Sequence, residues 1–127
     1  MCSICVSVCP NLALMTYRTE PFSAELPEWK VVGGGLHPAG TRSFRVCQLF
    51  QIVVLTDFCD ECGNCETFCP TSGRPYRDKP RLYLRESEFA AEADNAFMIV
   101  RRNAGWSMKA RFRGETHQLA WDDELTY

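Results

Sequence analysis

Eight cysteines stand out in this chain of 127 residues, and seven of them fall into two tight clusters. The longer cluster is the run Cys59-Asp60-Glu61-Cys62-Gly63-Asn64-Cys65-Glu66-Thr67-Phe68-Cys69-Pro70, with the spacing C-x2-C-x2-C-x3-C-P. That spacing is typical of bacterial proteins that hold a [4Fe-4S] cluster, because three closely spaced thiolates let a tight loop wrap one cluster. Gly63 gives the loop the backbone freedom that such wrapping needs. The run therefore predicts iron-sulfur binding.

The first ten residues repeat the end of this run. Their spacing from Cys2 to Pro10 is C-x2-C-x3-C-P. In two-cluster proteins with this motif, the last cysteine of each run ligates the other cluster. Cluster one is therefore expected to take Cys9, Cys59, Cys62 and Cys65 as its ligands.

Cluster two lacks one ligand in this sequence. It would use Cys2, Cys5 and Cys69, and its fourth cysteine would stand three or four residues before Cys2. Three explanations stay open: the chain is a fragment or has a misassigned start, or Cys47 supplies the ligand, or the site holds a three-iron cluster. Cys47 is left out of the expected ligand set, because it lies among apolar residues of an expected strand, where a free cysteine behaves as a small hydrophobe.

A structural zinc site is the main alternative, since C-x2-C pairs also suit tetrahedral zinc. The chain would then be a zinc-stabilised structural or interaction module. Zinc motifs seldom combine two consecutive x2 steps with x3-C-P, so the doubled motif favours iron and sulfide. A third hypothesis is a free-standing ferredoxin with one complete cluster and one three-iron cluster.

Charge and composition narrow the classes of partner. Lys and Arg total 14 against 16 Asp and Glu, so the chain lacks the basic excess of nucleic-acid-binding proteins. Its least polar stretch, residues 46–55, is too short to span a bilayer. No basic and then apolar leader precedes Cys2, so we expect a cytoplasmic protein whose clustered thiols bind metal rather than form disulfides.

The elements around the cysteines are expected to be short. Residues 17–42 are rich in Pro, Gly and charge, which predicts an irregular insert. Residues 43–57 are rich in β-branched and aromatic side chains, which predicts one or two strands leading into the second cysteine run. A short strand is expected over 82–84 and one or two helical turns over 86–94.

A period of two marks the C-terminal part of the chain. Apolar residues alternate with polar or cationic ones, in the order Trp106, Ser107, Met108, Lys109, Ala110, Arg111, Phe112 and Arg113. This alternation predicts a strand with an apolar inner face and a cationic face in solvent. With turn residues on either side, residues 97–121 are expected to form a small antiparallel meander.

The cysteine runs also resemble a known family. Cys2 to Asn11 together with Cys59 to Pro70, followed by Gly73-Arg74-Pro75-Tyr76-Arg77-Asp78-Lys79, is similar to the C-terminal ferredoxin-like region of the putative selenate reductase iron-sulfur subunit family. Those proteins carry a flavoprotein part, akin to the glutamate synthase small subunit, ahead of this region. This chain departs from them in a longer segment between the motifs and in lacking the flavin and nicotinamide portion.

The resemblance implies the electron-transfer part of a larger flavin- and NAD(P)H-linked oxidoreductase. Its partners would be a flavoprotein domain or subunit and a terminal electron acceptor, and the chain would not reduce a substrate alone. Nothing in these residues supports selenate itself. Two [4Fe-4S] clusters would add negative charge, which favours basic docking partners or local compensation by Arg74, Arg77, Lys79 and Arg81.

Together these observations predict an α+β fold with a two-cluster, bacterial ferredoxin-like core. Residues 1–85 would form the ferredoxin-like 2[4Fe-4S] domain, with the irregular insert inside it. Residues 86–127 would form a C-terminal β extension that contains the meander.

Overall fold

The computed structural model of the chain describes residues 2–124; Met1 and the end of the expected β extension, residues 125–127, lie outside the described part. The chain divides into two compact units. The smaller unit is Arg18–Gln51, and the larger one combines Cys2–Tyr17 with the chain from Ile52 onward. No helix within residues 2–124 has the length and apolar character needed to cross a bilayer.

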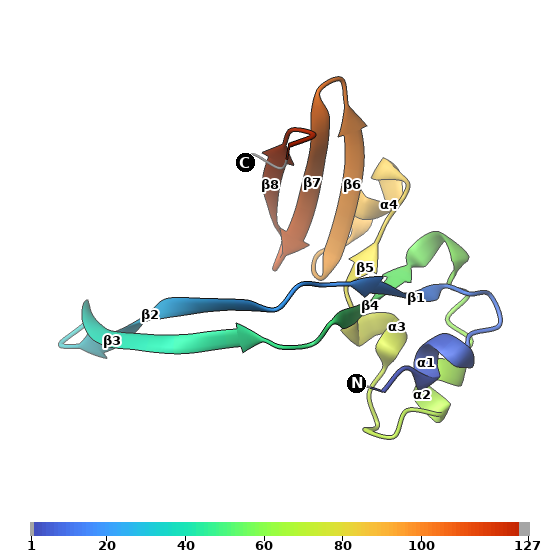
Figure 1. Cartoon of the computed structure of the whole chain (residues 1–127), viewed down its shortest axis with the longest axis horizontal. Coiled ribbons are helices and arrows are strands. Elements are labelled where there is room, and N and C mark those ends of the chain that lie inside the picture. Colours follow the sequence, from blue (N-terminus) through green and yellow to red (C-terminus); the bar gives the residue numbers. More distant parts are fainter. Residues whose placement is uncertain (1, 125–127) are drawn as a thin grey trace. The chain divides into compact units, whose positions relative to one another are not determined.

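The larger unit is built on a sheet in the order β1-β4-β5-β6-β7-β8 (Figure 1). Its strands are β1 (Leu14–Arg18), β4 (Phe50–Leu55), β5 (Arg81–Leu82), β6 (Ala96–Arg102), β7 (Gly105–Phe112) and β8 (Glu115–Trp121). Its helices are α1 (Ile4–Ser7), α2 (Asn64–Thr67), α3 (Pro75–Asp78) and α4 (Glu86–Ala91), with a 3-10 turn at Thr56–Phe58. The β5 strand pairs in parallel with β4 and β6, and the β6-β7-β8 meander is antiparallel.

The expected α+β, ferredoxin-like fold class is wrong. Among the described residues strand far exceeds helix, and the strands form one mixed sheet of six strands and one sheet of two. The helices are only four to six residues long. One physical reason lies in the sequence: Pro10 and Pro70 follow the cysteine runs, and proline cannot continue a helix.

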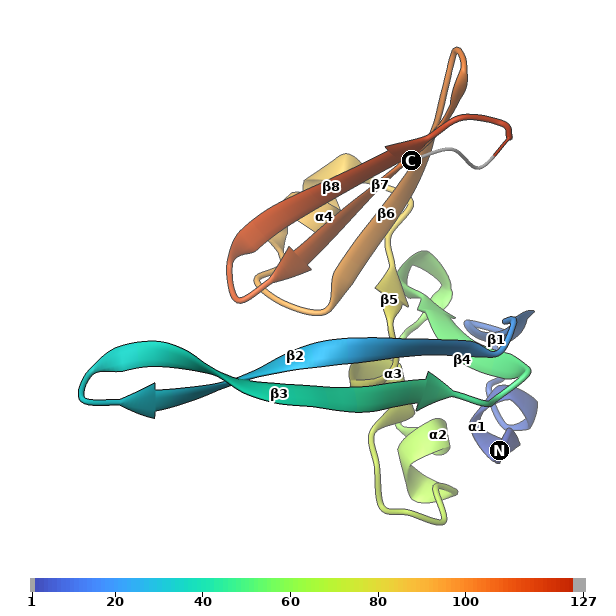
Figure 2. The ribbon, with the colours of Figure 1, turned by 60° about the vertical axis from the view of Figure 1, so that its left-hand side comes forward.

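The prediction of an irregular insert over residues 17–42 is also wrong, because most of this segment forms a long hairpin. Strand β2 (Phe22–Val32) pairs antiparallel with β3 (Gly35–Val46), as Figure 2 shows. The turn needs positive φ angles, and Gly33 (φ 58°) and Gly34 (φ 83°) supply them. Prolines are tolerated here because each strand of a two-stranded sheet has a free edge.

The C-terminal strands lie where the alternation predicts them, but the two faces are used differently. The ammonium of Lys109 lies 2.8 Å from the Glu86 carboxylate of α4. The guanidinium of Arg111 donates to the Ala90 carbonyl of the same helix at 2.7 Å. The cationic face of β7 is therefore covered by α4 and does not face solvent as expected.

The other face of the sheet carries an open apolar cavity of about 540 Å³. Its lining comes from five strands and the residue before β5: Met15, Tyr17, Val53, Pro80, Leu82, Phe97, Ile99 and Met108. The apolar half of the β7 alternation thus faces this cavity through Met108. Between the sheet and α4, a separate core holds Tyr83, Phe89, Ala96 and Met98.

Candidate metal centre

Four cysteine side chains from two distant segments line one pocket. Cys59, Cys62 and Cys65 belong to the loop between the 3-10 turn and α2, and Cys9 closes the N-terminal run. The rest of the lining is Leu14, Asp60, Glu61, Gly63, Asn64 and Tyr76. The structure thus brings together the four residues that the motif spacing assigns to cluster one.

Strands β1 and β4 form a buried core against which residues of this pocket pack. Leu14 of β1 and Ile52 and Val54 of β4 form a buried core with Cys5 and Cys65. The Leu55 amide donates to the Ala13 carbonyl at 2.8 Å, which joins the chain after the first cysteine run to the chain before the second. This strand pairing places Cys9 beside the loop that contains the other three thiols.

The 59–65 loop is held by local polar contacts. The Asn11 side chain hydrogen-bonds the Asp60 carboxylate, which also accepts the Cys62 amide at 3.2 Å, so the pKa of Asp60 lies below its usual value. Gly63, at φ 80°, precedes α2 in the left-handed region that glycine enters without strain. Outside the loop, Arg77 pairs with Glu61 at 3.0 Å and ties α3 to it.

Burial disfavours ionisation of two of the pocket thiols, those of Cys59 and Cys65. Desolvation raises the pKa of Cys59 and Cys65, and the neighbouring thiols raise it further because thiolates repel one another; Cys9 acts in this way on both. Backbone hydrogen bonds at Glu61 and Tyr76 oppose the shift. A metal centre needs thiolates, so its binding must release these protons.

The donor set fits an iron-sulfur cluster, which takes four cysteine thiolates. The cavity between the lining residues has a volume of about 10 Å³. Within residues 2–124, no three His, Cys, Asp or Glu side chains are grouped tightly enough to hold a single metal ion.

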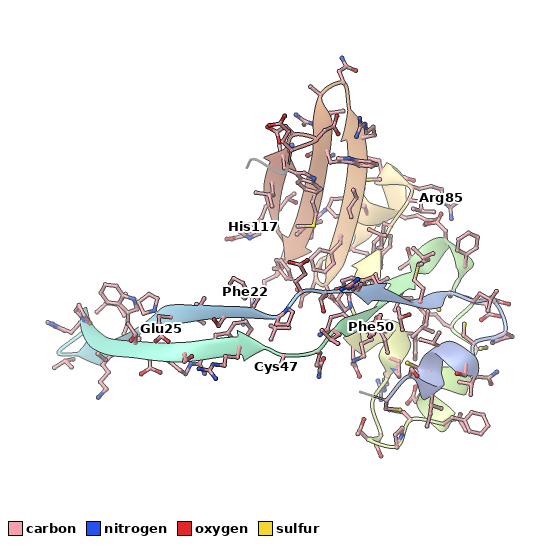
Figure 3. All side chains as sticks on the ribbon, viewed as in Figure 1. Phe22, Glu25, Cys47, Phe50, Arg85 and His117 are labelled. Carbon is pink, nitrogen blue, oxygen red and sulfur yellow. The ribbon has the colours of Figure 1, made fainter. Side chains whose placement is uncertain are left out.

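The other three predicted ligands lie outside the lining of this pocket. Cys5 is buried in the adjoining core, where desolvation raises its pKa, and Cys2 is exposed. The Cys69 sulfur lies 3.3 Å from the Thr71 hydroxyl and accepts the Gly73 amide at 3.3 Å. These hydrogen bonds lower the pKa of Cys69. Cys47, in Figure 3, follows the end of β3 and is exposed rather than part of a strand.

The two cysteine runs fold alike, sixty residues apart. The amides of Val8 and Phe68 donate to the carbonyls of Ile4 and Asn64 at 3.0 and 3.1 Å. Leu12 and Ser72 both adopt φ 54°. The Ala13 amide donates to the Cys9 sulfur at 3.3 Å, as the Gly73 amide does to Cys69. Helices α1 and α2, which belong to these matching turns, are in contact (Figures 1 and 2).

A second, polar pocket of about 210 Å³ adjoins the site through Cys59. Arg81 forms two hydrogen bonds to Glu92 there, at 2.8 and 3.3 Å, and lies over the Tyr83 ring at 5.6 Å. Three cations that the sequence offers for charge compensation are paired within the chain: Arg74 with Glu66, Arg77 with Glu61 and Arg81 with Glu92. No sequence pattern indicates the Arg81–Glu92 pair or Tyr76 in the lining, because these contacts join separate segments.

Two comparisons with known proteins bear on this site. The chain is 28% identical over 126 residues to "Putative oxidoreductase YgfK" of Escherichia coli strain K12, which covers 94% of this chain and 10% of that protein. It is 29% identical over 99 residues to the protein of the same name in E. coli O157:H7, covering 78% of this chain and 7% of that protein. The chain thus spans about a tenth of the length of these relatives. No family model and no solved structure matches it.

Proposed function

We propose that the chain transfers electrons through a [4Fe-4S] cluster held by Cys9, Cys59, Cys62 and Cys65. The observation that carries the proposal is the convergence of these four thiols on one pocket from two runs of the sequence. The donor set is the one that such clusters use. The similarity to an oxidoreductase supports a redox role.

The chain's own residues would bind, shield and tune this centre. When bound, the cluster supplies one-electron chemistry. Leu14 and Tyr76 line the pocket and exclude water from it, while the Ala13 amide donates to the Cys9 sulfur. Exclusion of water favours the less charged, oxidised state of the cluster and so lowers its reduction potential. Hydrogen bonds to sulfur favour the more negative, reduced state and so raise that potential.

A second centre is part of the same proposal. The matching turns and the contact of α1 with α2 support it. By the ligand exchange typical of two-cluster motifs, Cys69 would join Cys2 and Cys5. These three thiols would hold a three-iron cluster, or a [4Fe-4S] cluster whose fourth ligand comes from elsewhere.

The partners are proposed from the family resemblance of the cysteine runs, and the comparison with the longer relatives supports a redox partner. The chain aligns with about a tenth of a protein named as an oxidoreductase. We therefore infer that it serves as the iron-sulfur part of a larger flavin- and NAD(P)H-linked enzyme and relays electrons from the flavin to a terminal acceptor. In that role it does not reduce a substrate by itself.

Metal analysis of the full chain tests the proposal. Protein purified without oxygen, or reconstituted with ferrous iron and sulfide, should be brown and should contain iron and acid-labile sulfide. Reduction with dithionite should bleach its visible absorption and produce an electron paramagnetic resonance (EPR) signal. A colourless protein with stoichiometric zinc would overturn the proposal in favour of a zinc-stabilised interaction module.

A further inference from the structure

The apolar cavity on the face of the sheet opposite α4 is open, with a volume of about 540 Å³. None of the eight described residues that line it carries a charge. Three of them are well exposed: Met15 at 43%, Tyr17 at 42% and Ile99 at 46%. Contiguous exposed apolar surface of this kind marks an interaction site.

The parallel pairing of β5 indicates that this face is covered in the assembled protein. β5 pairs in parallel with β4 and β6, and Leu82 of β5 lies opposite Phe97 of β6 in the cavity lining. Parallel strands occur almost only in sheets with both faces covered, usually by helices. On one face, Phe89 of α4 joins a core with Met98 of β6. On the cavity face, no helix residue within 2–124 contributes to the lining.

The charge and shape of this face favour one kind of covering element. Arg101, two residues along β6 from Ile99, is already paired with Asp123 at 2.6 Å, so the covering element needs no charge to match it. A symmetric dimer centred on this face would set the cavity against its own copy and leave a void, whereas protein interiors are close-packed. A convex apolar surface, such as one side of a helix, would fill the cavity. In the E. coli K12 relative the matching segment is 10% of the protein, so most of that protein lies outside it and can supply such a helix.

We propose that this cavity receives the apolar side of an amphipathic helix from the rest of the larger oxidoreductase. The inference rests on the proposed function and adds the surface through which the two parts join. Along β4, Val53 of the cavity lies between Ile52 and Val54, which belong to the core beside the four-cysteine pocket. Successive side chains of a strand point to opposite faces, so the helix covers the face of β4 opposite the candidate metal centre.

A chimera tests the inference, with this chain in place of the aligned segment of the E. coli K12 protein. Hydroxyl radicals oxidise exposed Met and Tyr side chains, mass spectrometry measures the rate for each, and a reporter peptide fixes the radical dose. Met15, Tyr17 and Met108 should be oxidised several-fold more slowly in the chimera than in the free chain. Ile99→Arg should remove this protection. Val100→Arg should keep it, because Val100 is comparably exposed, at 40%, but points to the other face of β6.

The free chain supplies a second measurement that does not depend on folding of the chimera. It should sediment as a monomer and bind the uncharged apolar dye Nile red, and Ile99→Arg should bind less dye than Val100→Arg. Equal oxidation in the chimera and the free chain, or a free chain that binds no dye, would overturn the inference. So would a wild-type dimer that Ile99→Arg dissociates, which would assign the face to a second copy. Neither readout depends on iron, so metal analysis judges the proposed cluster separately.

Discussion

The chain holds two sets of cysteines with related spacing, and the structure surrounds them differently. Cys59, Cys62, Cys65 and the distant Cys9 line one pocket. In the other set, Cys2 is exposed and Cys5 is buried. The sulfur of Cys69 forms hydrogen bonds with the Thr71 hydroxyl and the Gly73 amide. The local turns match, so spacing alone accounts for the turns. The gathering of four thiols depends on the pairing of β1 with β4, which brings the first run beside the second.

The largest effect should come from Cys62→Ser. Its thiol is exposed, so its loss removes a ligand without emptying the core. We expect iron to fall by about four atoms per chain, the content of one [4Fe-4S] cluster, as measured by metal analysis and visible absorption. Cys47→Ser is the matched control, because Cys47 is also exposed but belongs to neither run. Equal iron in both variants would show that the 59–65 loop holds no cluster.

The next test asks whether the two sets exchange ligands. Cys9→Ser should damage the cluster that the 59–65 loop wraps, because Cys9 lines that pocket. Cys2→Ser should damage only the other centre. EPR spectra of the two variants, compared with that of Cys62→Ser, distinguish the outcomes. If Cys9→Ser loses only the N-terminal centre and retains the spectrum of cluster one, ligand exchange does not occur.

The sequence is most informative where contacts are local. The C-x2-C spacing predicts the turns, and the period of two predicts β7, because both depend on residues that are neighbours in the chain. It failed for the hairpin, where two glycines with positive φ angles outweighed the prolines and charges around them. It also assigned the cationic face of β7 to solvent, because nothing in the alternation shows that Glu86 of α4 will pair with Lys109.

A smaller effect, on stability, should distinguish the N-cap residues of α1 and α2, which are Ser3 and Gly63. Gly63 has φ 80°, and an added Cβ would meet no atom within 4 Å. Gly63→Ala should therefore cost about 1 kcal/mol of unfolding free energy through backbone strain alone. Ser3, at the same place in the other turn, has φ -123°, and its side chain makes no capping hydrogen bond, so Ser3→Ala should change stability by less than about 0.5 kcal/mol. Urea unfolding measures both, and equal losses would contradict the difference in backbone conformation.

The smallest expected effect on stability concerns the polar pocket that adjoins the candidate metal centre through Cys59. Hydrogen bonds from Arg81 hold the pKa of Glu92 below its usual value, against the opposing effect of burial. A carboxylate with a lowered folded-state pKa adds stability above its unfolded pKa, near 4.5, and loses it as the pH falls through the folded value. The Glu92 side chain is 35% exposed, so solvent screening limits the contribution to below about 1 kcal/mol.

Glu92→Gln should therefore unfold at lower urea than the wild type at pH 7, and the gap should narrow as the pH falls below 4.5. Glu88→Gln is the matched control: Glu88 lines the same pocket and pairs with Arg85, whose side chain is 62% exposed. Its gap should be smaller, because that ion pair is better solvated. A gap that stays constant with pH would mean that Glu92 supports this side of the site by packing.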